Sequence, residues 1–240
     1  MNFIQKFTGS RWNWFLKGLP SLPRSHALFR AKRYTLTSST RCQKLWDQCD
    51  QIFQSNVPGD LVECGVWRGG SAVIMALAAR HFKQQRRIHL FDSFEGLPEP
   101  TAADEKAAKD YSEGKASGSL TSIGKCSVGL EEVKDLLLNK LQFDKSFIHF
   151  HVGWFQNTIP ADAEKMGPIA LLRLDGDWYE STRICLEYLY PKISPGGLVI
   201  LDDYHFWVGC KKATNEYREQ HGITAPIQEI DGDAIYWMKD

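Results

Sequence analysis

Short apolar runs alternate with amphipathic and alanine-rich segments along most of the chain. Five of these runs predict buried strands, at residues 61–66, 88–91, 147–152, 169–174 and 198–201. Apolar spacing and composition predict helices at residues 41–56, 71–82, 130–139 and 182–189. Residues 225–240 have the pattern of two further strands around the turn dipeptide Asp231-Gly232. Strands that alternate with helices indicate an α/β fold, in which a mostly parallel sheet is covered on both faces.

The N-terminal region departs from this alternation. Residues 1–40 form an extension that Pro20 and Pro23 interrupt, and its first part interleaves bulky aromatics with basic residues. A weak interfacial segment is one interpretation, although a helix that packs on its own domain or on a second subunit is the simpler one. We therefore expect substrate or homo-oligomer contacts from residues 1–40 and the main domain at residues 41–240.

A second departure lies after the predicted strand at 88–91. Residues 99–127 have no clear periodicity and are rich in Ala, Ser, Gly, Lys and Glu. A flexible surface loop is the plainer interpretation. A loop of this length inside a compact domain is, however, often a lid over a site, and its position after the second strand favours that function. We expect residues 99–127 to form a lid.

The overall composition is that of a globular domain, with 240 residues of which 43% are hydrophobic and 24% charged. Lys and Arg together equal Asp and Glu at 29 each, so the chain as a whole has no general attraction to nucleic acid or anionic membranes. No apolar stretch near the N-terminus has the length of a membrane span. Six cysteines without a CxxC pair predict buried, reduced thiols in a cytoplasmic protein.

The first predicted strand leads into a glycine-rich turn. In parallel α/β sheets the ligand binds beyond the carboxyl ends of the strands, where this turn lies. The spacing of Gly65, Gly69 and Gly70 fits neither the dinucleotide fingerprint nor a P-loop, and a plain tight turn would also explain it. Glu63 precedes the turn, and its carboxylate would repel a pyrophosphate but suits an ammonium group.

An acid also ends the second predicted strand. Asp92 lies where a carboxylate usually binds ribose hydroxyls, although a turn or helix cap is an equal alternative for this residue alone. Together, Glu63 and Asp92 fit an adenosine that carries an amino-acid group and no phosphate. S-adenosylmethionine has this composition, and the missing fingerprint disfavours a nicotinamide cofactor.

Three more acids follow the fourth and fifth predicted strands. Asp175 ends one strand, and Asp202 and Asp203 end the other. Neighbouring strands are about 4.8 Å apart, so these carboxylates would repel one another in a partly desolvated cleft. A divalent cation resolves the repulsion, with Mg²⁺ first and Mn²⁺ or Ca²⁺ after it. The alternative is that the acids cap helices or pair with basic residues, namely Arg173, Lys211 and Lys212.

Five ordered motifs give the chain a family resemblance. The region from about Tyr34 to Lys239 closely resembles the macrocin-type sugar O-methyltransferases, which methylate sugar hydroxyls of macrolide and aminocoumarin antibiotics. The motifs that carry the resemblance are PGDLVECGVWRGGS, LFDSFEGLP, GWFQNTIP, LLRLDGDWYEST and GGLVILDDY. The Trp-rich extension departs most from the family, which leaves the acceptor open.

The resemblance implies a class I, Rossmann-like fold with a seven-stranded sheet, and it implies S-adenosylmethionine and Mg²⁺ as cofactors. The cofactor-binding residues that it implies are Glu63, Gly65, Asp92, Ser93, Ser127, Gly153 and Trp154. The metal ligands that it implies are Asp175, Asp202 and Asp203, and the general base that it implies is Asp175. In our hypothesis for the reaction, Asp177 is the alternative base. The predicted reaction is Mg²⁺-dependent methylation of a hydroxyl of a sugar or glycoside, in natural-product or polysaccharide biosynthesis. A catechol or phenol O-methyltransferase and a non-catalytic cofactor-binding protein are the alternatives.

Overall fold

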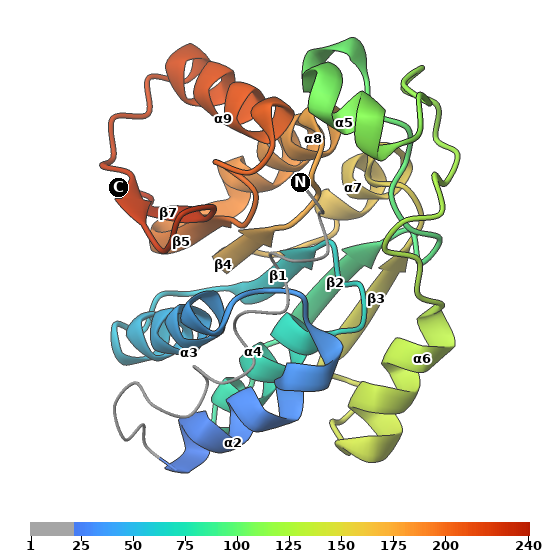
Figure 1. The fold of residues 1–240 in the computed structure, drawn as a ribbon. Helices are drawn as coiled ribbons and strands as arrows, with labels where there is room; N and C mark the ends of the chain where they lie inside the picture. Colours follow the sequence, from blue (N-terminus) through green and yellow to red (C-terminus); the bar gives the residue numbers. More distant parts are fainter. Residues whose placement is uncertain (1–21) are drawn as a thin grey trace.

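A seven-stranded sheet forms the centre of the structure, a computed structural model that describes residues 22–240 (Figure 1). The strand order is β3-β2-β1-β4-β5-β7-β6. Strands β1 to β5 run parallel, and β7 runs antiparallel to both β5 and β6. The strand bounds are β1 (Asp60–Cys64), β2 (Ile88–Asp92), β3 (Ile148–Val152), β4 (Ile169–Leu174), β5 (Ile193–Leu201), β6 (Gln228–Glu229) and β7 (Ile235–Met238). The predicted, mostly parallel seven-stranded sheet is confirmed.

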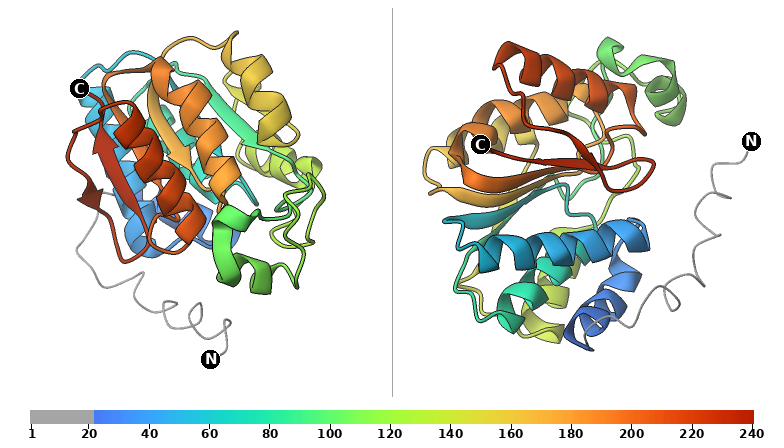
Figure 2. Two further views of the ribbon diagram at one scale, coloured as in Figure 1. Left: turned by 90° about the horizontal axis from the view of Figure 1, so that it is seen from above. Right: turned by 90° about the vertical axis from the view of Figure 1, so that its left-hand side faces the viewer.

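Helices cover both faces of this sheet, as the right-hand view of Figure 2 shows. One face carries α2 (Leu22–Ala31), α3 (Ser39–Gln54), α4 (Gly70–His81) and α6 (Leu130–Lys134), the last continuing as a π-helical segment over Asp135–Lys140. The other face carries α5 (Glu105–Tyr111), α7 (Phe155–Ala163), α8 (Tyr179–Leu189) and α9 (Val208–Gln220). Short 3₁₀ segments lie at Lys32–Tyr34, Ala102–Asp104 and Tyr190–Lys192.

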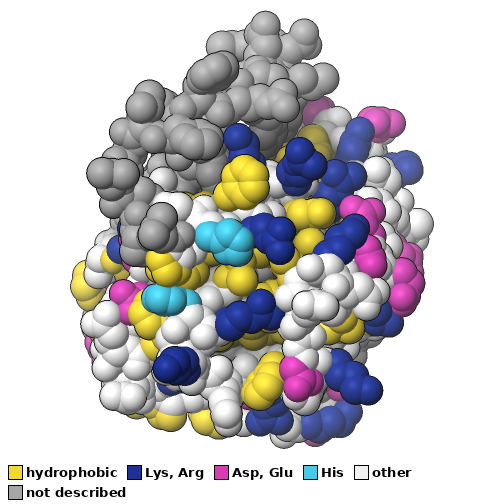
Figure 3. Space-filling model, turned by 90° about the horizontal axis from the view of Figure 1, so that it is seen from below, with side chains coloured by type: hydrophobic (Ala, Val, Ile, Leu, Met, Phe, Trp, Pro, Cys, Tyr) yellow, Lys and Arg dark blue, Asp and Glu magenta, His cyan; other side chains and the backbone are white. Residues whose placement is uncertain are grey.

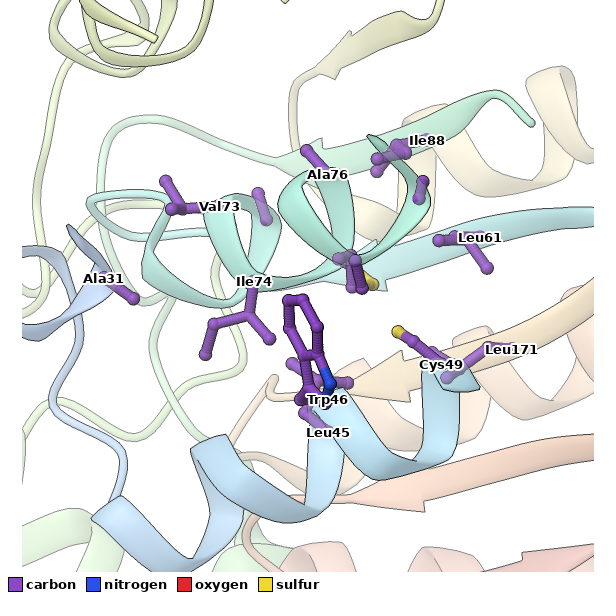
Figure 4. Close-up of a cluster of buried hydrophobic side chains, with 14 of the residues drawn as sticks. Ala31, Leu45, Trp46, Cys49, Leu61, Val73, Ile74, Ala76, Ile88 and Leu171 are labelled. Carbon is purple, nitrogen blue, oxygen red and sulfur yellow. The ribbon is translucent and has the colours of Figure 1, made fainter. Parts of the chain in front are cut away.

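Each central strand is buried on both faces, which explains its nearly unbroken apolar sequence. In β1, Leu61 packs in the core under α2, α3 and α4, whereas Val62 packs in the core under α7, α8 and α9. On the α3 side, Trp46 fills the space beside Ile74 of α4 (Figure 4). The alternation along β1 continues to Glu63, which therefore points to the same side as Leu61.

Four helices were not predicted from the sequence, namely α2, α5, α7 and α9. Helix α7 contains Pro160, and α9 has few apolar residues, so neither has a strong amphipathic pattern. Helix α2 lies inside the predicted extension, whose residues 1–21 are outside the described part of the chain. Strand β5 begins five residues before its predicted start, because it includes the turn-forming residues Pro195, Gly196 and Gly197. Gly196 N donates a hydrogen bond to Lys239 O at 2.7 Å, and Gly197 O accepts one from Lys239 N at 2.9 Å.

The segment 99–127 is more ordered than its composition predicts. It contains α5 and is joined to α8 by a buried side chain, since Asp104 accepts hydrogen bonds from Thr101 N at 2.8 Å and from Tyr179 N. Pro98, which directly precedes the segment, accepts a hydrogen bond through its backbone oxygen from Trp178 Nε1 at 3.0 Å. Whether these residues act as a lid stays a prediction.

Two other expectations concern the cysteines and the membrane. All six cysteines are free thiols, and all but Cys126 are buried. Within residues 22–240, no helix combines the length and the apolar character that crossing a bilayer requires.

Candidate active site

A cleft of about 850 Å³ opens at the carboxyl edge of the sheet. The strand ends are tied together beneath it by three backbone hydrogen bonds, Gly65 N to Phe91 O at 2.9 Å, Asp175 N to Cys64 O at 2.8 Å and Asp202 N to Leu174 O at 2.9 Å. The predicted site residues that line the cleft are Glu63, Gly65, Asp92, Ser93, Trp154, Asp175, Asp177, Asp202 and Asp203. Ser127 and Gly153 do not line it, although their chain neighbours Cys126 and Trp154 do.

The glycine-rich turn closes on the end of β4. Gly65 has φ of 92°, and a Cβ atom at this position would lie 1.9 Å from Asp175 O. The carboxylate of Asp92 accepts hydrogen bonds from Val66 N at 2.7 Å and from Trp67 N at 3.1 Å. Burial raises the pKa of Asp92 although these hydrogen bonds oppose the shift. Asp92 therefore caps the turn, as one of its two predicted functions requires. The residue also lines the cleft, where a ligand could reach it.

A buried guanidinium connects three strand ends. Glu63 of β1 and Arg173 of β4 are register partners, so their side chains leave the sheet on the same side. Arg173 Nη1 lies 2.9 Å from Glu63 Oε1 and 2.9 Å from Asp175 Oδ2, and Nη2 lies 2.7 Å from Asp202 Oδ1. Burial alone would lower the pKa of Arg173, but the three carboxylates raise it well above its usual value.

A second guanidinium comes from the start of α3. Arg41 Nη1 lies 2.6 Å from Asp202 Oδ2, and Arg41 Nε lies 2.9 Å from Asp231 Oδ2 in the turn between β6 and β7. Both carboxylate oxygens of Asp202 are thus held by arginines. Arg41 was not among the residues that the sequence analysis singled out. The basic partners considered there, Lys211 and Lys212, instead lie over the rings of Tyr204 and Tyr179.

The carboxylates that could share a metal ion are those of Asp175, Asp177 and Asp203. One oxygen atom from each lies within 4.8 Å of the others. The cluster therefore contains Asp177 in place of Asp202, because Asp202 points to the two arginines. Asp177 N donates to Asp203 Oδ2 at 3.3 Å, and Trp207 Nε1 donates to Asp177 Oδ1 at 2.6 Å.

The electrostatics of this cluster favour a cation. Burial and then the neighbouring Asp175 raise the pKa of Asp177 to about 8. Burial and then Asp177 raise the pKa of Asp203 well above its usual value. The ion pairs of Arg41 and Arg173 reach Asp175 and Asp202 but neither Asp177 nor Asp203. An oxygen-only donor set of three carboxylates suits Mg²⁺, which keeps several waters when proteins bind it.

The cleft also contains an acceptor without a partner among residues 22–240, on Glu63, whose other carboxylate oxygen shares Arg173 Nη1 with Asp175. Glu63 is 1% exposed, and its Oε2 has no hydrogen-bond partner among the described residues. Burial raises the pKa of Glu63 to about 8, with Arg173 opposing the shift. Buried polar atoms normally have partners, so this oxygen points to a ligand with a donor or positive group.

Comparisons with known proteins show the family to which the chain belongs. The family profile of macrocin O-methyltransferase (TylF) matches residues 29–239. A tetracenomycin C 4'-O-methyltransferase of Streptomyces olivaceus, which acts on the 8-demethyl-8-(2,3-dimethoxy-α-L-rhamnosyl) compound, is 39% identical over 205 residues, covering 85% of this chain and 75% of that protein. The demethyldecarbamoylnovobiocin O-methyltransferase of Streptomyces niveus is 36% identical over 210 residues, covering 87% and 77%.

The fold agrees as well. The solved structure of the O-methyltransferase NovP superposes with a TM-score of 0.75 at 36% identity, covering 86% of this chain and 82% of that one. The chain belongs to the macrocin O-methyltransferase (TylF) family of S-adenosylmethionine-dependent O-methyltransferases.

Proposed function

We propose that this protein transfers the methyl group of S-adenosylmethionine to a hydroxyl of a sugar or glycoside, with Mg²⁺ held by Asp175, Asp177 and Asp203. The observation that carries the proposal is that Asp177 and Asp203, whose carboxylates form no ion pair among residues 22–240, line the same cleft as Glu63, whose Oε2 has no hydrogen-bond partner there. The carboxylates of Asp177 and Asp203 suit a divalent cation, and the Glu63 oxygen suits the ammonium group of the methyl donor.

The donor would lie across the ends of β1 and β2. Glu63 Oε2 accepts a hydrogen bond from its ammonium group, and Asp92 presents a carboxylate to the ribose side of the cleft. Trp154, which lines the cleft after β3, offers an apolar surface for the adenine. The assignments of Ser127 and Gly153 to the adenine remain predictions from the family resemblance.

The acceptor would lie over the three carboxylates. When Mg²⁺ is bound, it acts as a Lewis acid that lowers the pKa of the acceptor hydroxyl. Asp175 accepts the hydroxyl proton, because Arg173 holds its Oδ2 and so orients the carboxylate. Asp177 is the second candidate for this task. Methyl transfer needs little covalent assistance, so positioning of the two substrates supplies much of the rate.

The rim of the cleft suits a sugar. Hydrogen-bonding groups of Thr37, Ser38 and Asp233 line it together with the aromatic rings of Phe206 and Trp207. The first related enzyme named above acts on a rhamnosyl compound according to its name. We propose an acceptor of this class, a deoxysugar of a natural product or of a cell-surface glycan. The free thiols are consistent with a cytoplasmic protein, and a homo-oligomer stays a prediction.

The reaction is tested by mass spectrometry of products after incubation with S-adenosylmethionine, with and without EDTA. The acceptor panel contains deoxysugar glycosides, cell-envelope glycans and catechols. We expect methylated glycosides only, and only without EDTA. Methylated catechols would support the phenolic alternative, and EDTA-insensitive transfer would contradict the metal's role.

The choice of metal ligands is tested by titration calorimetry with Mg²⁺. We expect Asp177→Asn to weaken Mg²⁺ binding by about tenfold or more, because it removes one of three anionic ligands. Asp202→Asn should change Mg²⁺ binding less, since two arginines hold this carboxylate. The exposed Asp135→Asn is the control for charge alone. Stronger dependence on Asp202 than on Asp177 would restore the ligand set that the family resemblance implied.

A further inference from the structure

The net charge of the chain is zero, but its basic and acidic residues are unevenly distributed along the sequence. Residues 1–46 contain nine Lys and Arg and no Asp or Glu, since the first acid of the chain is Asp47. The remaining 194 residues contain 20 Lys and Arg and 29 Asp and Glu. A segregation of this kind points to an anionic partner for the N-terminal part.

In the described part of this region, exposed basic residues lie in a stripe along one side of helix α2. Helix α2 buries Ala27, Leu28 and Ala31 in the core, through which it packs on α4. Its opposite side exposes His26, Phe29 and Arg30, and the stripe continues to Arg33, a spacing of i, i+3, i+4 and i+7. Phe29 is 68% exposed, more than any other large hydrophobic residue among those described.

The cations on this stripe have no acidic partners in the fold. Among residues 22–240, neither Arg30 nor Arg33 forms an ion pair, whereas Arg24 pairs with Asp47 at 3.2 Å. The neighbouring helix α4 ends in the exposed basic residues Arg80 and His81, and the exposed Lys83 follows it. The underside of the molecule accordingly shows Lys, Arg and His side chains gathered among hydrophobic ones (Figure 3).

We propose that the stripe of His26, Phe29, Arg30 and Arg33 (the α2 stripe) docks on the surface of an anionic lipid bilayer. The chain that precedes α2 has a matching composition, with aromatics and cations interleaved and no acid: Phe3, Lys6, Phe7, Arg11, Trp12, Trp14, Phe15 and Lys17. Aromatic side chains bind at the level of the lipid headgroups, and Lys and Arg are attracted to anionic lipids.

Other partners fit these features less well. A second copy of the chain would bring the same cationic stripe against itself in a two-fold interface, which is repulsive. Nucleic acid would satisfy the cations of the stripe but offers no apolar layer for Phe29 and the preceding aromatics. The proposal concerns a peripheral contact and does not depend on the reaction proposed above.

The test is co-sedimentation of the full chain with vesicles of phosphatidylcholine alone or mixed with about one third phosphatidylglycerol. We expect binding to the anionic vesicles in low salt, little binding to neutral ones, and release in high salt. Arg30→Glu/Arg33→Glu should lower the partition coefficient by more than about tenfold, and Phe29→Ser by about threefold or more.

The matched control is Lys211→Glu/Lys212→Glu, which reverses two exposed charges on α9, across the sheet from α2. It should bind vesicles like the unmodified chain, and circular dichroism checks that every variant is folded. The proposal would be overturned if the unmodified chain did not bind anionic vesicles or bound neutral vesicles equally well. It would also be overturned if the α9 control lost as much vesicle binding as the α2 variants. Self-association through the α2 stripe, seen by sedimentation velocity without lipid, would assign it to a second copy instead.

Discussion

Arg173 Nη2 lies 2.7 Å from Asp202 Oδ1, in a pocket where the arginine side chain is 3% exposed. The other terminal nitrogen of Arg173 contacts Glu63 and Asp175. One guanidinium thus contacts Glu63, Asp175 and Asp202 at once. In this cluster, Asp177 and Asp203 form no ion pair with an arginine among residues 22–240, which is why the metal ligands that we propose differ from those that the family resemblance implied.

Removal of this guanidinium should destabilise the fold. Arg173→Met leaves three carboxylates without their shared cation, so we expect the free energy of unfolding to fall by about 3–5 kcal/mol. Urea denaturation measures the change. The control is Arg183→Met, whose exposed pairs with Glu180 and Glu187 should contribute less than about 1 kcal/mol. Equal effects of the two substitutions would contradict the central role of Arg173.

Substitution of Glu63 should affect the donor more than the fold. Glu63→Gln replaces an anionic acceptor for the donor's ammonium group with a neutral one, so we expect affinity for S-adenosylmethionine to fall by about ten- to a hundredfold. Titration calorimetry gives the affinity, and thermal denaturation checks folding. The exposed Glu95→Gln, from the loop after β2, should bind the donor normally. Unchanged affinity in Glu63→Gln would remove Glu63 from the donor site.

The attachment of residues 99–127 should depend on Asp104. This side chain is 2% exposed and joins the segment to the first turn of α8. Asp104→Ala leaves buried N–H groups without an acceptor, at a cost of about 1–3 kcal/mol. Hydrogen exchange of the amides in 99–127 should become faster, while exchange in β4 is unaffected. The exposed Asp110→Ala on α5 serves as the control, and equal exchange in both variants would show that Asp104 does not anchor the segment.

The histidines beside α7 should make stability depend on pH. His151 Nε2 lies 2.9 Å from His89 Nδ1, and His151 Nδ1 lies 2.9 Å from Asp162 Oδ2. Burial lowers the pKa of His151 below its usual value near 6.5, although Asp162 opposes the shift. The unfolded chain therefore binds more protons just below pH 6.5, and stability should fall as the pH falls through this value.

The variant His151→Gln removes this titration. We expect the free energy of unfolding, measured by urea denaturation at several pH values, to vary less with pH between about 5 and 7 in this variant than in the unmodified chain. The exposed His221→Gln should keep the original slope. If His151→Gln kept it as well, the pH dependence would arise elsewhere.

Local patterns determined most of the sheet. Strand β4 has its predicted bounds, because six residues buried on both faces give a nearly continuous apolar run. The acids at strand ends were also predictable, since parallel strands deliver the residues that follow them to one edge. The helices α7 and α9 were not, because burial against the sheet stabilises them more than their own sequence periodicity does.

The sequence by itself determined the α/β order and the strand ends at which the acids lie. Only the tertiary structure decided which acids remain without a cation, because Arg41 reaches Asp202 from a helix 161 residues away in the chain. Distances between charged atoms depend on how distant segments pack, and no local pattern encodes them. The same packing exposes Phe29 beside unpaired arginines, although the total charge of the chain is zero.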